Sequence, residues 1–122
     1  MNSRILQFAL ALIIYTTSMS SVIADEWYEG GTLSNKDNIA WLDATDGNKL
    51  ASAADSVAVF FNEKLLVPRI QNHISYQDID SFKPYAQELV DCIDEGSQTS
   101  AVVRYTEMAI VCVASMGWLG GS

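Results

Sequence analysis

Few side chains in this sequence are of the types that carry out acid–base, nucleophilic or metal chemistry. His73 is the sole histidine. Nucleophilic triads and most zinc sites need a histidine with partners that the fold places beside it. A lone histidine in a stretch without clear periodicity is typical of a surface or partly packed residue. We therefore expect a protein that is not an enzyme, with no catalytic residue, no cofactor and no metal ligand.

The segment around Gly47 contains closely spaced oxygen ligands, among them Asp43 and Asp46. An EF-hand loop places calcium ligands at positions 1, 3 and 5 and glycine at position 6. With Gly47 at position 6, position 1 falls on Leu42, which has no oxygen to offer. A helix that begins after an N-capping Thr45 explains the segment better.

Asp91, Asp94 and Glu95 place three carboxylates at the end of an expected helix. Paired carboxylates hydrolyse glycosides, but that reaction needs a cleft and aromatic platforms on a larger scaffold. Negative charge at a helix C-terminus is unfavourable. The cluster is therefore balanced within the fold, by Arg104 or Lys83, or by a basic partner. Balance within the fold is the simpler explanation.

Cys92 and Cys112 are the two cysteines. An even count in an exported chain favours a disulfide, and closing a loop of about 20 residues contributes roughly 3 kcal/mol of stability. An intermolecular bridge or two buried thiols are the alternatives. The C-x-x-C spacing typical of redox-active pairs is absent.

The N-terminus reads as a signal peptide over residues 1–24. Arg4 gives a positively charged start, residues 5–15 are apolar apart from Gln7, and Ala24 ends an A-x-A-like cleavage signal. Eleven residues are too few to span about 30 Å of hydrocarbon as a helix. We expect cleavage after Ala24, no membrane anchor thereafter, and a periplasmic or secreted product.

The expected mature chain, residues 25–122, is one acidic domain. It keeps all fifteen acidic residues and six of the seven basic ones, a formal charge of −9. Nucleic-acid binding requires a basic face, so that class of partner is excluded. Anionic lipid should repel the domain. An acidic surface favours solubility and suits a basic protein partner.

Hydrophobic spacing predicts an all-α fold, a small four-helix array at about residues 34–44, 45–63, 80–96 and 102–116. The second helix has the clearest apolar stripe, formed by Leu50, Ala53, Ala54, Val57, Ala58 and Phe61. The stretch 68–77 is a loop or a single turn.

Local signals predict the ends and faces of the first helix. Ser34 is the expected N-cap. Ile39 and Leu42 lie three residues apart and are expected to face inward, with Trp41 off that stripe.

Similar signals bound the last two helices. Asp80 or Ser81 is expected to cap the third helix, and Gly96 to end it in a left-handed conformation. The fourth helix is apolar almost all round over residues 108–114, which predicts the most buried helix of the fold. Gly117 is expected to end it, and Cys92 near one helix end suits a disulfide to Cys112 in the next.

Large aromatic residues are frequent for a chain of this size. They are either anchors of the core or, where exposed, an interface hot spot. They comprise Trp27, Tyr28, Trp41 and Trp118.

The order of these features resembles that of small exported bacterial helical proteins. The residues concerned are Trp27-Tyr28-x-Gly30-Gly31-x-Leu33, Trp41, Asn48-Lys49-Leu50-Ala51-x-Ala53-Ala54-Asp55, Cys92-Ile93-Asp94-Glu95, Cys112 and Met116-Gly117-Trp118. Similar layouts occur in the HdeA family of periplasmic acid-stress chaperones and in the Rap1a/Tai immunity proteins of type VI secretion. Those families use an earlier cysteine, so no functional residue carries over.

The resemblance implies a small disulfide-bonded protein that acts by binding other proteins. We therefore expect an immunity-like or inhibitor-like module. An acid-stress chaperone is the main alternative, followed by an unrecognised enzyme or an envelope-accessory protein. The strongly patterned second helix argues for a stable fold, against a chaperone that opens in acid.

Overall fold

The computed structural model describes residues 26–120. The expected signal peptide at residues 1–24 lies outside the described residues. The elements, in chain order, are the helices α2 (Asn38–Asp43), α3 (Asp46–Asn62) and α4 (Pro68–Gln71), the 3-10 helix η1 (Ile79–Phe82), and the helices α5 (Lys83–Gly96) and α6 (Tyr105–Ser115). Over the described residues β structure is limited to isolated bridges. The predicted all-α class is confirmed.

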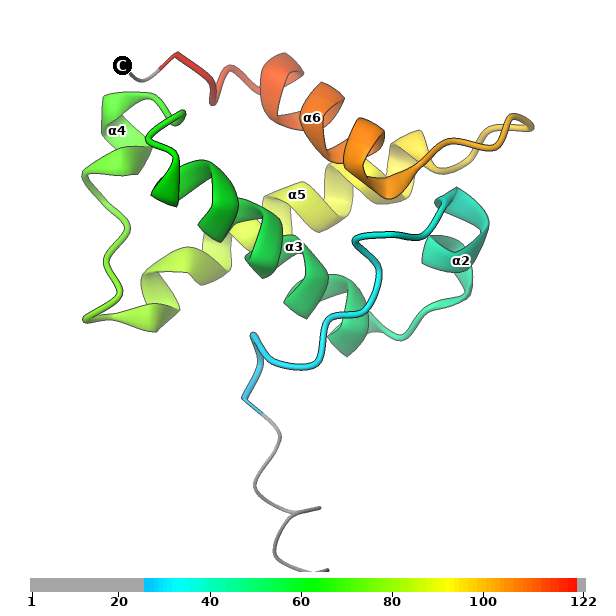
Figure 1. Cartoon of the computed structure of the whole chain (residues 1–122), viewed down its shortest axis with the longest axis horizontal. Coiled ribbons are helices and arrows are strands. Elements are labelled where there is room, and N and C mark those ends of the chain that lie inside the picture. Colours follow the sequence, from blue (N-terminus) through cyan, green and yellow to red (C-terminus); the bar gives the residue numbers. More distant parts are fainter. Residues whose placement is uncertain (1–25, 121–122) are drawn as a thin grey trace, which may run out of the picture.

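Each of the four expected helices has a counterpart, and α4 adds a single turn in the stretch that the sequence left open. α3 packs on α5, and α5 packs on α6. In Figure 1, α3 crosses in front of α5, while α6 runs along the upper side of α5. Ala53 and Ala54 are buried on α3, and their small side chains let α5 approach closely. None of the helices in the described part of the chain is both long and apolar enough to cross a membrane.

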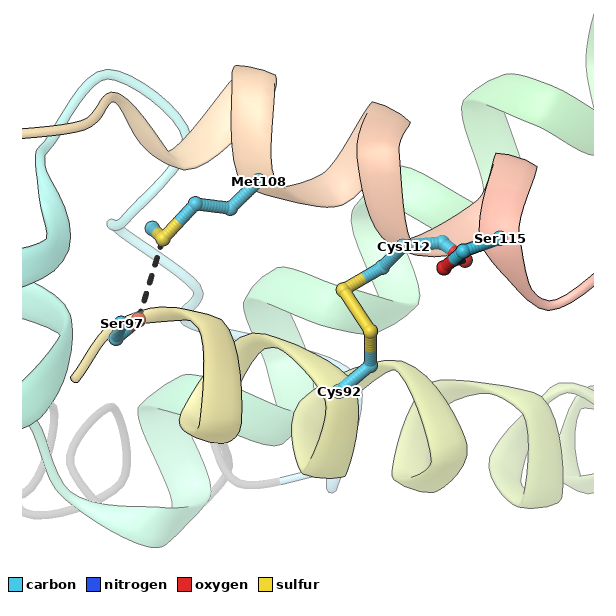
Figure 2. Close-up of a disulfide and its surroundings, with 5 residues drawn as sticks. All are labelled: Cys92, Ser97, Met108, Cys112 and Ser115. Atoms are coloured by element: carbon cyan, nitrogen blue, oxygen red, sulfur yellow. Dashed lines mark hydrogen bonds between the residues drawn. A yellow bond between two sulfur atoms is a disulfide. The ribbon is translucent and has the colours of Figure 1, made fainter. Parts of the chain in front are cut away.

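Cys92 and Cys112 form a disulfide within the chain, so the intermolecular bridge and the free thiols are excluded. Their Cα atoms lie 5.9 Å apart, and the bond joins the middle of α5 to α6 (Figure 2). The cysteines are 20 residues apart in sequence, so the bond contributes about 3 kcal/mol in the loop-entropy model. It holds α6 firmly against α5.

The N-terminus of α2 is capped by Asp37 rather than by the expected Ser34. The Asp37 Oδ1 atom accepts a hydrogen bond from the Ala40 N–H at 3.0 Å. Ser34 lies in the preceding turn. Both residue types are good caps, and the helix begins three residues later than expected.

The buried face of α2 is the opposite of the one predicted. Ile39 and Leu42 are 61% and 47% exposed, whereas Trp41 is completely buried. Asn38 shares the inward face with Trp41, and its side-chain amide bonds the carbonyls of Ser97 and Ala101. Asn38 with Trp41 and Ile39 with Leu42 are both three residues apart, so spacing alone fits either face. The larger apolar area of the tryptophan, together with hydrogen bonds for both polar groups, decides the outcome.

The ends of α5 also differ from expectation. Neither Asp80 nor Ser81 caps it: both lie in η1, and the N-cap position is Phe82 with no side-chain hydrogen bond. Gly96 is the last helical residue, without a positive φ. The chain continues through Ser97 in a right-handed conformation, and the Ser97 N–H bonds the Ile93 carbonyl at 2.8 Å. The end of α5 therefore does not require a residue with a positive φ.

The end of α6 agrees with the prediction. Gly117 has a φ of 73°, the left-handed conformation that glycine adopts freely after a helix. The reversal folds Trp118 back into the core, where it is 2% exposed. Leu119 then pairs with Leu66 in an isolated antiparallel β-bridge.

Candidate functional site

The outer face of α6 is apolar and exposed to solvent. Ile110 is 53% exposed and Val111 is 65% exposed. The exposed residues of this side are Thr106, Glu107, Ile110, Val111 and Ala114, and we refer to them as the α6 outer face. The opposite face is buried and also largely apolar, formed by Tyr105, Met108, Ala109, Cys112 and Val113.

α6 has the largest buried fraction of the helices in the described chain, five of its 11 residues, so the prediction that it is the most buried helix is confirmed. It is not enclosed on all sides, however. A small domain buries a smaller share of its surface than a large one, so its helices keep an exposed side. α6 packs on α5 along one side, and none of residues 26–120 covers its outer face. The α6 outer face is the feature that sequence reasoning missed. The sequence pattern that could have revealed it is the apolar character of residues 108–114 on all sides, because a helix of that kind buries its second face only against another molecule or another part of the chain.

A groove of about 530 Å³ runs between α5 and α6. We call it the disulfide groove. It is lined by Cys92, Glu95, Gly96, Val103, Glu107, Met108, Val111 and Cys112. Figure 2 shows the disulfide bridging the two helices, with Met108 reaching toward Ser97 at one end. The Ser97 Oγ lies 3.2 Å from the Met108 sulfur.

The two carboxylates of the disulfide groove belong to its opposite walls. Glu95 is in the last turn of α5 and Glu107 is in the first turn of α6. These two turns adjoin, because the Ser97–Met108 contact connects them. The disulfide groove is therefore acidic at this end and apolar toward Val111.

A second groove, of about 330 Å³, lies on the other side of α6, against α3. We call it the tyrosine groove. Its apolar lining consists of Val59, Phe60, Ala109 and Ile110, and its polar lining of Ser34, Asp55, Ser56, Tyr105 and Thr106. Ile110 and Val111 thus form a ridge with a groove on either side.

Tyr105 forms the base of the tyrosine groove. Its hydroxyl donates to the Ser52 carbonyl at 3.0 Å, which leaves the Ser56 hydroxyl, 2.7 Å away, to donate to the phenolic oxygen. Burial raises the pKa of Tyr105 to about 12, the Ser56 hydrogen bond lowers it, and the negative charge of Asp55 raises it. The phenol therefore stays protonated at neutral pH and serves as a hydrogen-bond donor.

Asp55 is the one carboxylate that lines the tyrosine groove. Burial raises its pKa from the ordinary value of 3.8, because partial loss of water destabilises the charged form. Among residues 26–120 the sole ion pair is formed elsewhere, between Lys49 and Asp94.

The acidic cluster at the end of α5 is only partly balanced within the fold. Asp94 accepts from Lys49 Nζ at 3.0 Å and from the Trp41 indole at 2.8 Å. The compensating cation is therefore Lys49, and neither Arg104 nor Lys83 takes that role.

The remaining candidate residues of the sequence lie apart from one another. His73 is exposed, with its Nδ1 2.6 Å from the Tyr85 hydroxyl. Thr45 caps α3 by accepting from the Asn48 N–H at 3.1 Å, as the turn interpretation predicts. Within the described residues, no three His, Cys, Asp or Glu side chains are grouped so that they could hold a metal ion.

The aromatic residues are mainly core anchors. Trp41 and Trp118 are buried, and Trp27 and Tyr28 are half-buried against the core. The Trp27 indole donates to Asp80 Oδ1 at 2.8 Å. Apart from Tyr76, the exposed large hydrophobic residues of the described chain are aliphatic.

No family model matches the chain, and no curated protein or solved structure matches it significantly. The resemblance to HdeA and Rap1a/Tai proteins stays a prediction from the residue pattern.

Proposed function

We propose that this protein is a small module without enzymatic activity that binds another protein through α6, as an immunity or inhibitor protein does. One observation carries the proposal: Ile110 and Val111 are more than half exposed on a helix whose other face is also apolar. A helix that is apolar all round is normally enclosed. Exposed apolar patches rimmed by polar residues mark interaction sites.

The scaffold behind this surface supports the proposal. α6 is fixed by the disulfide to α5 and by the Tyr105 hydroxyl to Ser52 and Ser56 of α3. A surface held in place before binding loses little conformational entropy when the partner arrives. α6 is therefore suited to one defined partner.

Charge favours a basic protein as that partner. The chain has fifteen acidic and seven basic residues, a net charge of −8. Complementary charge speeds association and excludes wrong partners more than it raises affinity. The acidic surface argues against nucleic acid and anionic lipid as partners. The disulfide suits an oxidising compartment, so we place the protein in the periplasm or outside the cell, after removal of residues 1–24.

Site-specific photo-cross-linking tests the proposal. A photoreactive amino acid at Val111 is compared with the same group at Glu88, which is exposed on α5 and lines neither groove. We expect one cellular protein to be cross-linked from position 111 and not from position 88, and the purified pair to associate with 1:1 stoichiometry. Equal labelling from both positions, or none from 111, would contradict a binding role for α6.

A second candidate function is an acid-activated chaperone, and one observation favours it. Two tryptophan indoles, of Trp41 and Trp27, donate to the carboxylates of Asp94 and Asp80. A chaperone that opens near pH 2–3 would break both contacts and expose the apolar rings that they hold. Near-UV circular dichroism and dye binding between pH 7 and pH 2 separate the candidates. A specific binding module keeps its tertiary signal, whereas a chaperone loses it cooperatively and binds the dye.

A further inference from the structure

We infer that the disulfide groove receives an amphipathic helix of a basic partner. An apolar face of that helix lies on Val103 and Val111, and a lysine or arginine occupies the end lined by Glu95 and Glu107. The inference rests on the proposed binding function and specifies the site and the chemistry of the partner.

The shape and lining of the disulfide groove suit a helix. The groove lies between two antiparallel helices, α5 and α6, which is the arrangement that accepts a third helix by side-chain interdigitation. Val103, Met108 and Val111 supply its apolar surface. Gly96 has no side chain, so the α5 wall is low at the acidic end.

The two glutamates of the groove have no cation of their own. The sole ion pair among residues 26–120 joins Lys49 to Asp94, so neither Glu95 nor Glu107 forms an ion pair within the described chain. The Glu107 Oε1 atom accepts a hydrogen bond from the Arg104 N–H at 3.3 Å. Glu95 also lies in the last turn of α5, where that helix has no basic residue and where its dipole disfavours negative charge. A cation from a partner relieves this unfavourable placement.

A second copy of this chain does not fit the groove. It would bring a surface of the same negative charge against Glu95 and Glu107, and like charges at an interface are strongly unfavourable. A basic helix meets both requirements, since the aliphatic stem of a lysine or arginine packs on Val103 while its charged head reaches the carboxylates.

The first test uses a model peptide and the full chain. The peptide has about 18 residues, with leucines on one helical face and lysines and arginines on the other. A scrambled peptide of equal composition is the control for non-specific charge attraction. We expect the amphipathic peptide to bind with a micromolar Kd and to shift amide NMR signals of the disulfide groove. We expect the scrambled peptide to bind at least about tenfold more weakly.

Matched variants test the assigned residues. Glu95→Gln with Glu107→Gln should weaken binding at least about fivefold. Glu63→Gln with Glu88→Gln makes the same charge change at exposed positions outside the groove, and should change binding less than about twofold. Val111→Glu should abolish binding, whereas Ile39→Glu, at a similarly exposed position of α2, should not.

The outcomes separate this inference from the proposed function. Equal binding of the scrambled peptide, equal losses in the two glutamine pairs, or NMR shifts outside the disulfide groove would overturn the inference. If Val111 still cross-links one cellular protein in that case, the binding function stands and only the partner's chemistry is wrong. If a photoreactive group at position 111 cross-links no protein, both the proposed binding function and this inference are contradicted.

Discussion

Trp41 donates its indole N–H to Asp94 Oδ1 at 2.8 Å, and Lys49 Nζ reaches the same oxygen at 3.0 Å. The three residues belong to α2, α5 and α3. Lys49 also lies over the Trp41 ring, 5.5 Å from its centroid. One carboxylate thus joins three helices, and it satisfies the polar group of a tryptophan that is otherwise fully enclosed by the core.

Removal of the Asp94 carboxylate should therefore destabilise the fold. In Asp94→Ala the buried Trp41 indole loses its acceptor, which costs about 1–3 kcal/mol of unfolding free energy. Asp94→Asn keeps an oxygen for the indole but loses the ion pair with Lys49, so its loss should be smaller. Urea unfolding measures both. Asp91→Asn, on the exposed side of α5, is the control and should stay within about 0.5 kcal/mol of the natural protein. Equal stability of all three variants would show that the Trp41 contact contributes nothing.

The long-range contact of Trp41 with Asp94 also explains where sequence reasoning failed. Residues 46–62 of α3 have an apolar stripe extending over several turns, and its inward face was predicted correctly. α2 has six residues, so two opposite faces each offer one pair at three-residue spacing. Periodicity cannot choose between Ile39 with Leu42 and Asn38 with Trp41. The choice depends on partners more than 50 residues away in sequence.

The α6 outer face was missed for a different reason. Residues 108–114 are apolar on nearly all sides of the helix. That pattern is equally consistent with a helix enclosed by the fold and with a helix whose outer face binds another protein. The disulfide between Cys92 and Cys112 was predictable, because two cysteines allow one intramolecular pairing. Which side of α6 it leaves exposed depends on how α3 and α5 pack, and spacing alone does not determine that.

Close approach of the N-terminal segment to α3 requires a glycine at position 31. A Cβ atom added to Gly31 would lie 2.7 Å from the backbone nitrogen of Ser52. Gly31→Ala should therefore cost about 1–3 kcal/mol of stability. Gly47→Ala is the control, since a Cβ there meets nothing within 4 Å and the position is helical, so it should stabilise by up to about 1 kcal/mol. Thermal unfolding gives both values, and a neutral Gly31→Ala would show that the segment moves aside freely.

Asp55 should destabilise the protein at neutral pH. Burial raises its pKa above 3.8, so the folded state holds the proton more tightly than the unfolded state. This contribution to stability is present below pH 3.8 and is lost as the pH rises through the folded pKa. Asp55→Asn should therefore have a higher Tm than the natural protein at pH 7, and the difference should shrink toward pH 3. A Tm difference that is independent of pH would contradict a role for the charge.

Tyr105 should make the fold sensitive to alkaline pH. Its pKa is raised from 10.0 to about 12, so the folded state keeps the phenolic proton after the unfolded state has lost it. The resulting stability is fully present below pH 10 and falls as the pH rises toward 12. Two pKa units correspond to roughly 3 kcal/mol.

Tyr105→Phe isolates this contribution from the titration of other tyrosines and lysines. The variant loses the hydrogen bonds to Ser52 and Ser56 and should be less stable at pH 8 by about 1–2 kcal/mol. Because phenylalanine has no proton to lose, the deficit should narrow between pH 10 and pH 12, as measured by urea unfolding at each pH. Asp55→Asn removes a charge that raises the pKa of Tyr105, so the alkaline loss should be smaller in that variant and should level off at lower pH. If the stability difference between Tyr105→Phe and the natural protein stays constant up to pH 12, burial does not raise the pKa of Tyr105. Solvent would then reach the phenol through the tyrosine groove.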